Sequence, residues 1–204
     1  EQCELIDKDG DKIPLQKIDD GVLAYVELDA LSFTNFKKGD NLVCDIEKSK
    51  KLALENDLVK YEFDDDGALV SAFDKELQKE FMAESGNILS LYEDRPNNWD
   101  AWDVDFFYRD ALIETARAVE VSSLSAGSVI QQLRVMLSIG NSKIDQTITL
   151  HPHSKRLDFI THVDWIESHK MLRVHFPVNV RSEQASFDIQ YGYVRRNTHR
   201  NTSW

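Results

Sequence analysis

Residues 59–73, with the sequence VKYEFDDDGALVSAF, decide the fold class of this chain. Apolar and polar side chains alternate through residues 59–63, which is the period of a β-strand with one buried face. The pair Asp66-Gly67 follows, and then a second apolar run at residues 69–73. An Asp-Gly pair between two alternating runs is a strong short-range signal for a β-hairpin. We therefore predict a hairpin here and expect a β-rich fold.

The same two-residue alternation recurs in the second half of the chain, with turn residues between the runs. These runs are residues 144–150, 157–163, 172–176 and 187–193. Many short strands separated by turns are typical of an antiparallel sandwich or barrel.

Two of these strands carry finer predictions. Residues 129–139 (VIQQLRVMLSI) are more continuously apolar and rich in β-branched residues, which favours a strand buried on both faces. In the last run, the alternation places Phe187, Ile189, Tyr191 and Tyr193 on one face.

The composition limits the partners of the chain. Its 204 residues carry a net charge of −12 and a pI near 4.9, and we therefore expect no binding to nucleic acid or to anionic membranes, which require basic patches. No stretch approaches the roughly 20 consecutive apolar residues of a membrane-spanning helix. Cys3 and Cys44 match no metal or redox spacing, and we expect them to stay reduced.

Two indoles and several carboxylates lie close together just after a strand-like segment. The segment contains Trp99, Trp102, Asp94, Asp100 and Asp103. Flat aromatic faces can stack on the C–H side of a pyranose while carboxylates accept hydrogen bonds from its hydroxyls. The segment therefore indicates a sugar-contacting loop. The alternative is that the indoles close the edge of a hydrophobic core.

Three long segments together resemble the C-terminal β region of glycoside hydrolase family 38, the class II α-mannosidases, and look closest to its bacterial and cytosolic branch. The segments are residues 92–104 (YEDRPNNWDAWDV), residues 164–178 (DWIESHKMLRVHFPV) and residues 190–204 (QYGYVRRNTHRNTSW).

The resemblance implies an all-β fold, an antiparallel β-supersandwich of the galactose mutarotase type with part of a small preceding β domain. Residues 1–46 would be the end of the small domain and residues 52–204 the large sandwich. Because the sequence starts at Glu1 and stops at Trp204 within the third segment, we expect an excised fragment, truncated at its C-terminus.

The same resemblance implies that the parent protein is a zinc-dependent retaining α-mannosidase of the cytoplasm, acting on mannose-containing oligosaccharides. The nucleophile, the acid/base residue and the zinc ligands of the family lie in an N-terminal catalytic domain, which has no counterpart here. We therefore expect no catalytic and no metal-binding residue in the chain, and an inactive fragment. Its partners would be its own N-terminal catalytic domain and, through an exposed strand edge, a second copy.

The resemblance implies that some loops of the sandwich approach the sugar site or brace the domain interface, and nine residues are candidates for such contacts. From the first segment they are Asp94, Trp99, Asp100, Trp102 and Asp103, and from the third Arg196, Asn197, His199 and Asn201. A hydrogen-bonded loop inside the sandwich is the slightly preferred alternative for the third segment.

Several other patterns have an alternative explanation. Asp103 and Asp105 would share a face on a strand, as a pair of catalytic carboxyls does, but such a short acidic pattern says little. The two imidazoles of His151-Pro152-His153 can chelate a metal, although exposed turn histidines are favoured because no further ligands are near. Asn201 begins a glycosylation sequon that we expect to be unused. A carbohydrate-binding or scaffold module without chemistry is the second functional hypothesis, and a mutarotase-like epimerase is a third, weaker one.

Overall fold

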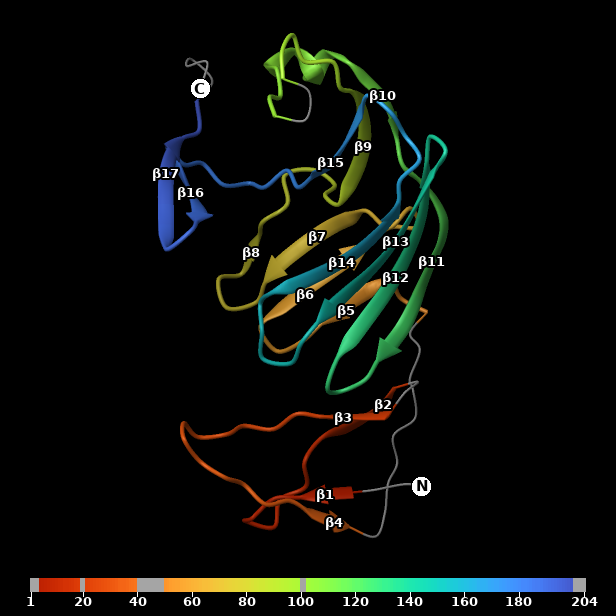
Figure 1. Ribbon diagram of the computed structural model, residues 1–204. Helices are drawn as coiled ribbons and strands as arrows, with labels where there is room; N and C mark the ends of the chain where they lie inside the picture. Colours follow the sequence, from red (N-terminus) through yellow and green to blue (C-terminus); the bar gives the residue numbers. More distant parts are fainter. Residues whose placement is uncertain (1–3, 19–20, 40–49, 100–101, 200–204) are drawn as a thin grey trace.

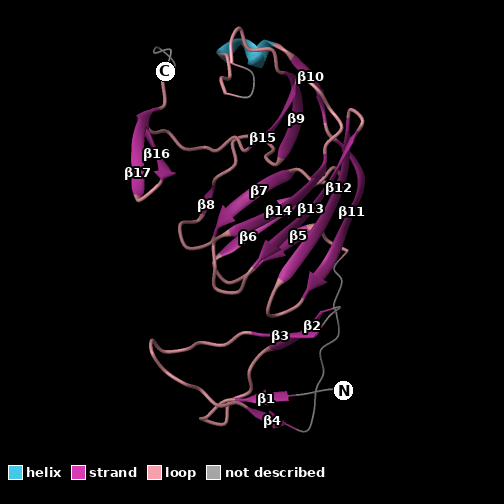
Figure 2. Ribbon diagram, viewed as in Figure 1, coloured by secondary structure: helices cyan, strands magenta, loops and turns pink. Residues whose placement is uncertain are grey.

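The computed structural model describes residues 4–18, 21–39, 50–99 and 102–199. In these residues every regular element is a β-strand, except the short 3₁₀ helix η1 (Phe106–Asp110), as Figure 2 shows. All strand pairs are antiparallel. The prediction of an all-β antiparallel sandwich is confirmed. None of the described residues forms a helix long and apolar enough to cross a membrane.

The predicted hairpin is the centre of the first sheet. In spatial order its strands are β5 (Ala53–Glu55), β6 (Val59–Phe63), β7 (Leu69–Asp74) and β8 (Lys79–Glu80). The turn between β6 and β7 is held by Asp64, whose carboxylate accepts the N–H groups of Asp66 at 3.0 Å and Ala68 at 2.9 Å. Gly67 has a φ of 76°, a left-handed conformation that glycine adopts without steric cost. The Asp-Gly pair therefore forms the turn that the sequence indicates.

Two further sheets complete the sandwich. The larger one consists of β11 (Arg117–Ala126), β12 (Gln131–Ile139), β13 (Ser142–Leu150) and β14 (Leu157–Asp164), in that spatial order. The smaller one has the order β10 (Leu112–Thr115), β9 (Ile88–Glu93) and β15 (Lys170–His175). Figure 1 shows the β11–β14 sheet lying against the β5–β8 sheet, with β9, β10 and β15 at the upper end of the view.

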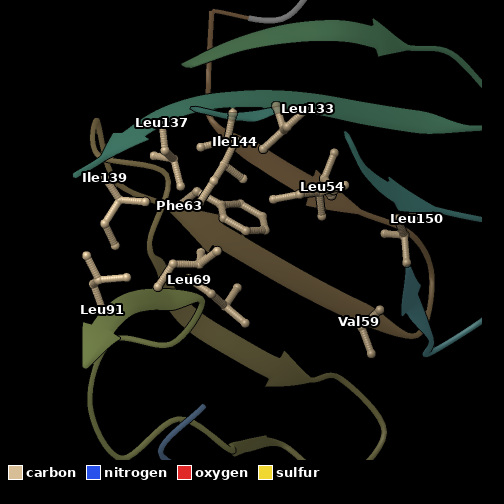
Figure 3. Packing of buried hydrophobic residues seen from close by; sticks show 13 residues of the cluster. Leu54, Val59, Phe63, Leu69, Leu91, Leu133, Leu137, Ile139, Ile144 and Leu150 are labelled. Carbon is tan, nitrogen blue, oxygen red and sulfur yellow. The ribbon is translucent and has the colours of Figure 1, made fainter. Parts of the chain in front are cut away.

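The hydrophobic core lies between these sheets. Figure 3 shows side chains of all three sheets converging, among them Leu54, Phe63, Leu69, Leu91, Leu133, Leu137 and Ile144. Full burial of a side chain of this kind stabilises the folded state by about 1.5–3 kcal/mol. Burial of one face of each strand in this core thus explains why apolar and polar residues alternate in the sequence.

The strand predicted over residues 129–139 exists as β12, but only one of its faces is fully buried. The buried residues are Leu133, Val135, Leu137 and Ile139. The side chains between them, such as Arg134 and Met136, are half-buried on the outer face of the sheet. The prediction of burial on both faces is therefore wrong. Among the described residues, another sheet packs against the inner face of β12, and none packs against its outer face.

The N-terminal residues form two small sheets beside the sandwich. The strands are β1 (Glu4–Ile6) paired with β4 (Lys37–Gly39), and β2 (Leu15–Ile18) paired with β3 (Gly21–Ala24). Gln16 of β2 is 2% exposed because its side chain enters the connection between β11 and β12. Its Oε1 accepts the N–H groups of Val129 at 2.8 Å and Ile130 at 2.7 Å, and its Nε2 donates to the Ile130 carbonyl at 2.8 Å. This side chain fastens the N-terminal strands to the sandwich. Cys3 and Cys44 lie outside the described residues.

The hairpin of β16 (Gln184–Ile189) and β17 (Gly192–Asn197) extends from the sandwich and stands apart from the three sheets in Figure 1. Phe187 and Ile189 lie on one face of this hairpin, as predicted, and each is 51% exposed. Tyr193 lies on the opposite face because it pairs with Asp188, so the prediction of a shared face is wrong. The two-residue turn at Gln190 and Tyr191, where Tyr191 has a φ of 63°, interrupts the alternation on which the prediction depended.

Candidate functional site

The first segment of interest forms a loop between β9 and β10, here called the indole loop (residues 94–111). Figure 1 shows the loop and η1 at the upper end of the molecule. Its two ends meet at a hydrogen bond from the Glu93 N–H to the Ala111 carbonyl at 2.9 Å. A second bond, from the Asp94 N–H to the His169 carbonyl at 2.8 Å, fixes the first residue of the loop to the segment before β15. The loop therefore begins and ends on rigid strands.

Inside the loop, two backbone hydrogen bonds meet at the carbonyl of Trp99. The Trp99 carbonyl accepts the N–H groups of Trp102 at 3.0 Å and Asp103 at 3.1 Å. Trp99 has a φ of 63°, which is uncommon for a residue with a bulky side chain and costs on the order of 1–2 kcal/mol. Across the loop, the Asp105 carboxylate accepts the Asn97 N–H at 2.7 Å. These hydrogen bonds fix the backbone positions of Trp99, Trp102 and Asp103.

The indoles are on the surface. Trp99 is 73% exposed and Trp102 85% exposed, so the alternative in which they close the edge of the core is wrong. Phe106 next to them is 82% exposed. Single exposed apolar residues are ordinary, but several large aromatic side chains on one loop indicate a surface that contacts something.

An aromatic cluster that the sequence did not reveal connects η1 of the loop to strands β9 and β15. Tyr108 of η1 packs edge-on against Tyr92 of β9, with ring centroids 5.4 Å apart. The Tyr92 hydroxyl lies 3.1 Å from Nε2 of His175, and the Arg173 guanidinium lies 4.9 Å from the centre of the Tyr108 ring. Arg173 and His175 occur in the second family segment at strand spacing, which is the only sequence signal for them. Their meeting with Tyr92 depends on the pairing of β15 with β9.

The described carboxylates of the loop have different surroundings. Asp94 and Asp103 are half-buried in the loop, and Asp100 lies outside the described residues. Residues 103–105 are not a strand, so the expectation that Asp103 and Asp105 share a strand face is wrong. Asp105 instead uses its carboxylate to hold the Asn97 N–H. What the loop offers chemically is flat apolar surface beside hydrogen-bond acceptors.

The candidate residues of the third segment lie elsewhere. Arg196 and Asn197 belong to β17 and His199 follows it; all three are exposed, while Asn201 lies outside the described residues. For the described residues 196–199 of this segment, the preferred alternative of a hydrogen-bonded loop inside the sandwich is therefore wrong. Between described residues, no hydrogen bond, ion pair or ring contact joins this hairpin to the indole loop. The structure thus joins Trp99, Trp102 and Asp103 through backbone hydrogen bonds, whereas Arg196, Asn197 and His199 lie on or beside β17.

The histidine pair after β13 has a structural explanation. His153 lies 3.0 Å from the Asp57 carboxylate, and His151 lies 3.6 Å from that of Asp158. Each imidazole has its own carboxylate, and both side chains are exposed, as the turn interpretation predicts. Within the described part of the chain, no group of three or more His, Cys, Asp or Glu is placed to hold a metal ion. The described residues therefore do not fit a zinc site.

Fold and loop together define a class: an antiparallel β-sandwich domain that presents aromatic and acidic side chains on a loop at one end. Residues 54–204 match the family described as glycosyl hydrolases family 38 C-terminal domain. The chain belongs to this family, as the three sequence segments indicated.

Known relatives agree with this assignment. Alpha-mannosidase 2C1 of Homo sapiens is 36% identical over 166 residues, and alpha-mannosidase G of Dictyostelium discoideum is 32% identical over 163 residues. The alignments cover 78% and 76% of this chain, but only 16% and 15% of those two proteins. An alpha-mannosidase of Saccharomyces cerevisiae is 30% identical over 154 residues, which is 68% of this chain and 14% of that protein. The chain therefore spans about a sixth of the length of the relatives that it matches.

Proposed function

We propose that this chain is the C-terminal β portion of an α-mannosidase that hydrolyses terminal α-mannosides with retention. The observation that carries the proposal is the family match over residues 54–204, together with relatives that are named alpha-mannosidase. Catalysis and zinc binding are assigned to a region outside these residues, and no chemical step is assigned to the chain itself. Its role is to support that region and to complete its surroundings.

We further propose that the indole loop is where this support is given. Trp99 and Trp102 lie on a turn that is anchored through Tyr108, and they are open to solvent. A face of this kind binds either the sugar chain of the substrate or the surface of the catalytic domain, because both present apolar C–H groups and hydrogen-bond donors. The candidate residues of the β17 segment belong to a separate contact surface in this proposal.

The first experiment measures hydrolysis of an aryl α-mannoside with added zinc, comparing the 204-residue chain with the full-length gene product. We expect activity in the full-length protein only. Turnover by the 204 residues alone would contradict the proposal, and would make the carboxylates of residues 94–105 the first positions to mutate.

The second experiment tests the indole loop in the full-length protein. The variant Trp99→Ala/Trp102→Ala is compared with Phe33→Ala, which removes a fully exposed aromatic ring from the N-terminal region. If the indoles contact substrate, KM for an oligomannoside rises while the thermal midpoint is unchanged. If they contact the catalytic domain, the thermal midpoint falls and KM changes little. Unchanged values of both would contradict a role for the loop.

A second candidate function is a carbohydrate-binding module without chemistry, which the same exposed indoles favour. Titration of the isolated chain with an α-linked mannotriose distinguishes the two functions. Millimolar or tighter binding that is lost in Trp102→Ala supports a binding module. Absence of binding by the isolated chain supports the interface role.

Three further proposals follow the family resemblance. Residues 1–46 are proposed as the end of a small β domain and residues 52–204 as the large sandwich; the separate small sheets of the N-terminal strands support this division. A mannose-containing oligosaccharide is the proposed substrate of the whole protein. The cytoplasm is its proposed location, from the resemblance to the cytosolic branch alone.

A further inference from the structure

The outermost strand of the larger sheet, β14, has a free edge. It is the last strand in the order β11, β12, β13, β14, and no described residue pairs with its other side. Its register with β13 is unbroken from Leu157 to Asp164, without a bulge. Proteins usually protect such an edge with proline, lysine, a bulge or a very short strand, and β14 has none of these. The strand therefore offers a row of backbone N–H and C=O groups to another strand.

The hydrophobic interior is also open along this edge. Ile144 of β13 is 2% exposed, whereas Val163, which lies opposite it on β14, is 38% exposed. On the outer face of the strand, Ile160 is 56% exposed. Both faces of β14 therefore leave apolar side chains in contact with water.

The charges of β14 are complementary to themselves when the strand pairs with a second copy of the chain. A two-fold axis perpendicular to a sheet pairs two identical strands antiparallel and places one residue opposite itself. With Ile160 at this centre, Arg156 lies opposite Asp164 of the second copy, and Asp158 lies opposite its His162. Each pair occurs twice because of the symmetry. Opposite charges that face each other across two strands stabilise the pairing.

Neighbouring registers lose this match. With Thr161 at the centre, Asp158 lies opposite Asp164, and like charges directly opposite each other are destabilising. With Phe159 at the centre, Asp158 lies opposite Ile160 and gains no positively charged neighbour across the strands. The sequence of the edge therefore favours one register out of the three.

We propose that β14 is a dimer interface, at which two copies of this chain pair antiparallel with Ile160 at the two-fold axis. The pairing joins the two four-stranded sheets into one continuous sheet. On its inner face Leu157 lies opposite Val163, and on its outer face the two Ile160 side chains meet. The second copy thus supplies hydrogen bonds to the free edge and removes apolar side chains on both faces from water.

A disulfide across the two-fold axis tests the register. Directly opposite residues of an antiparallel pair have Cα atoms about 4.5–5.5 Å apart, which is within the range of a disulfide. Ile160→Cys should therefore give a cross-linked dimer on mild oxidation, in a chain whose Cys3 and Cys44 are replaced by serine. His162→Cys is the matched control on the same face, because the two copies of residue 162 would be roughly 13 Å apart along the strand. Non-reducing gel electrophoresis measures the cross-linked fraction, and we expect the dimer only in Ile160→Cys.

A charge exchange tests the paired side chains. Arg156→Glu places a carboxylate opposite Asp164 of the second copy, and Asp164→Arg places a guanidinium opposite Arg156. Each variant alone should dimerise about tenfold or more weakly, because two attractive pairs become repulsive. An equimolar mixture of the two variants restores both pairs, so sedimentation velocity should show a mixed dimer with the affinity of the parent chain. Because neither substitution touches the β16–β17 hairpin, recovery on mixing is specific to β14.

Arg181→Glu and Asp65→Arg are the control variants. Both residues are exposed and lie outside β14, so each variant should dimerise as the parent chain does. Far-UV circular dichroism confirms that all variants fold.

Three results would overturn the proposal. They are equal cross-linking of the two cysteine variants, a mixture that associates no better than its components, and a monomer at all concentrations. The last result would assign the edge of β14 to a strand from outside these 204 residues. None of these readouts depends on mannosidase activity, so the interface is tested independently of the proposed function.

Discussion

At the scale of single residues, Gly67 shows how closely the turn is matched to the core. Its φ of 76° disfavours any side chain, and a Cβ atom placed there would lie 2.4 Å from Cγ1 of Val135. Val135 is completely buried and cannot move away without disturbing β12. Gly67 is therefore required both for the turn between β6 and β7 and for the close contact between this turn and β12.

We expect Gly67→Ala to lower the free energy of unfolding by about 2–4 kcal/mol, because backbone strain and overpacking add. Urea denaturation followed by circular dichroism measures this. Gly192→Ala is the control, since no atom lies within 4 Å of a Cβ at that position. An equal loss in both variants would refute the packing argument.

Glu167 makes the stability of the fold sensitive to acid. The Lys170 ammonium, 2.5 Å away, and the Asn141 N–H hold the pKa of the Glu167 carboxyl below its ordinary value. A carboxyl whose pKa is lower in the folded state stabilises the fold above its unfolded-state pKa, and this contribution is lost as the pH falls through the folded value.

We therefore expect the urea midpoint to fall below about pH 4.5, with a smaller fall in Glu167→Gln, which keeps an acceptor for Asn141 but cannot be ionised. Urea midpoints measured between pH 7 and pH 3 test this. The exposed Glu84→Gln serves as the control and should follow the parent chain. A Glu167→Gln curve that coincides with the parent curve would contradict the assignment.

At the scale of elements, the connection between β11 and β12 depends on a side chain from β2. Gln16 bonds two backbone N–H groups and one backbone carbonyl there, and also donates to the Ser125 hydroxyl. Without Gln16, the amides of Val129 and Ile130 lose their partner in a largely buried position. Stability of this connection and docking of β2 are therefore linked.

Gln16→Ala should accelerate hydrogen exchange at Val129 and Ile130 by about tenfold or more, because two buried N–H groups become unpaired. Hydrogen exchange followed by NMR measures the effect. Exchange at β6 should not change, and the exposed Gln184→Ala should leave all sites as they are. Equal acceleration throughout the sandwich would mean that Gln16 acts on global stability instead.

The elements also show how far the sequence was informative. The hairpin of β6 and β7 was predictable because its alternation and its Asp-Gly turn are adjacent in the chain. The indole loop was predictable as a surface feature from its composition. Its support by Arg173 and His175 was not, since these two residues come more than 60 positions after the end of the loop. The faces of β16 and β17 were mispredicted because Tyr191 occupies a left-handed turn position that a glycine would have signalled.

At the scale of the whole molecule, apolar side chains remain on the surface where the sheets end. The β16–β17 hairpin exposes Phe187 and Ile189, and the edge strand β14 exposes Ile160. A two-stranded hairpin alone is marginally stable in water, and unpaired edges with apolar residues favour association. The isolated chain should therefore self-associate.

We expect sedimentation velocity to show a concentration-dependent increase in mass for the isolated chain, reduced in Phe187→Lys. Lysine at this position adds a charge to the face that would be buried by association. Lys8→Ala, in an exposed turn of the N-terminal region, is the control and should behave as the parent chain does. A monomer at all concentrations would refute the prediction.

The closeness of the two ends of the indole loop has a consequence for protein engineering. Both ends of the loop meet at one backbone hydrogen bond, between Glu93 and Ala111, so the residues between them form a closed insertion in an otherwise continuous sheet. The entropy of closing a loop grows slowly with its length, so insertions of other lengths are tolerated at such a point. The sandwich can thus serve as a scaffold in which the indole loop is replaced by other loops. Each new loop would give this end of the domain a different binding preference, while β9 and β10 keep their register.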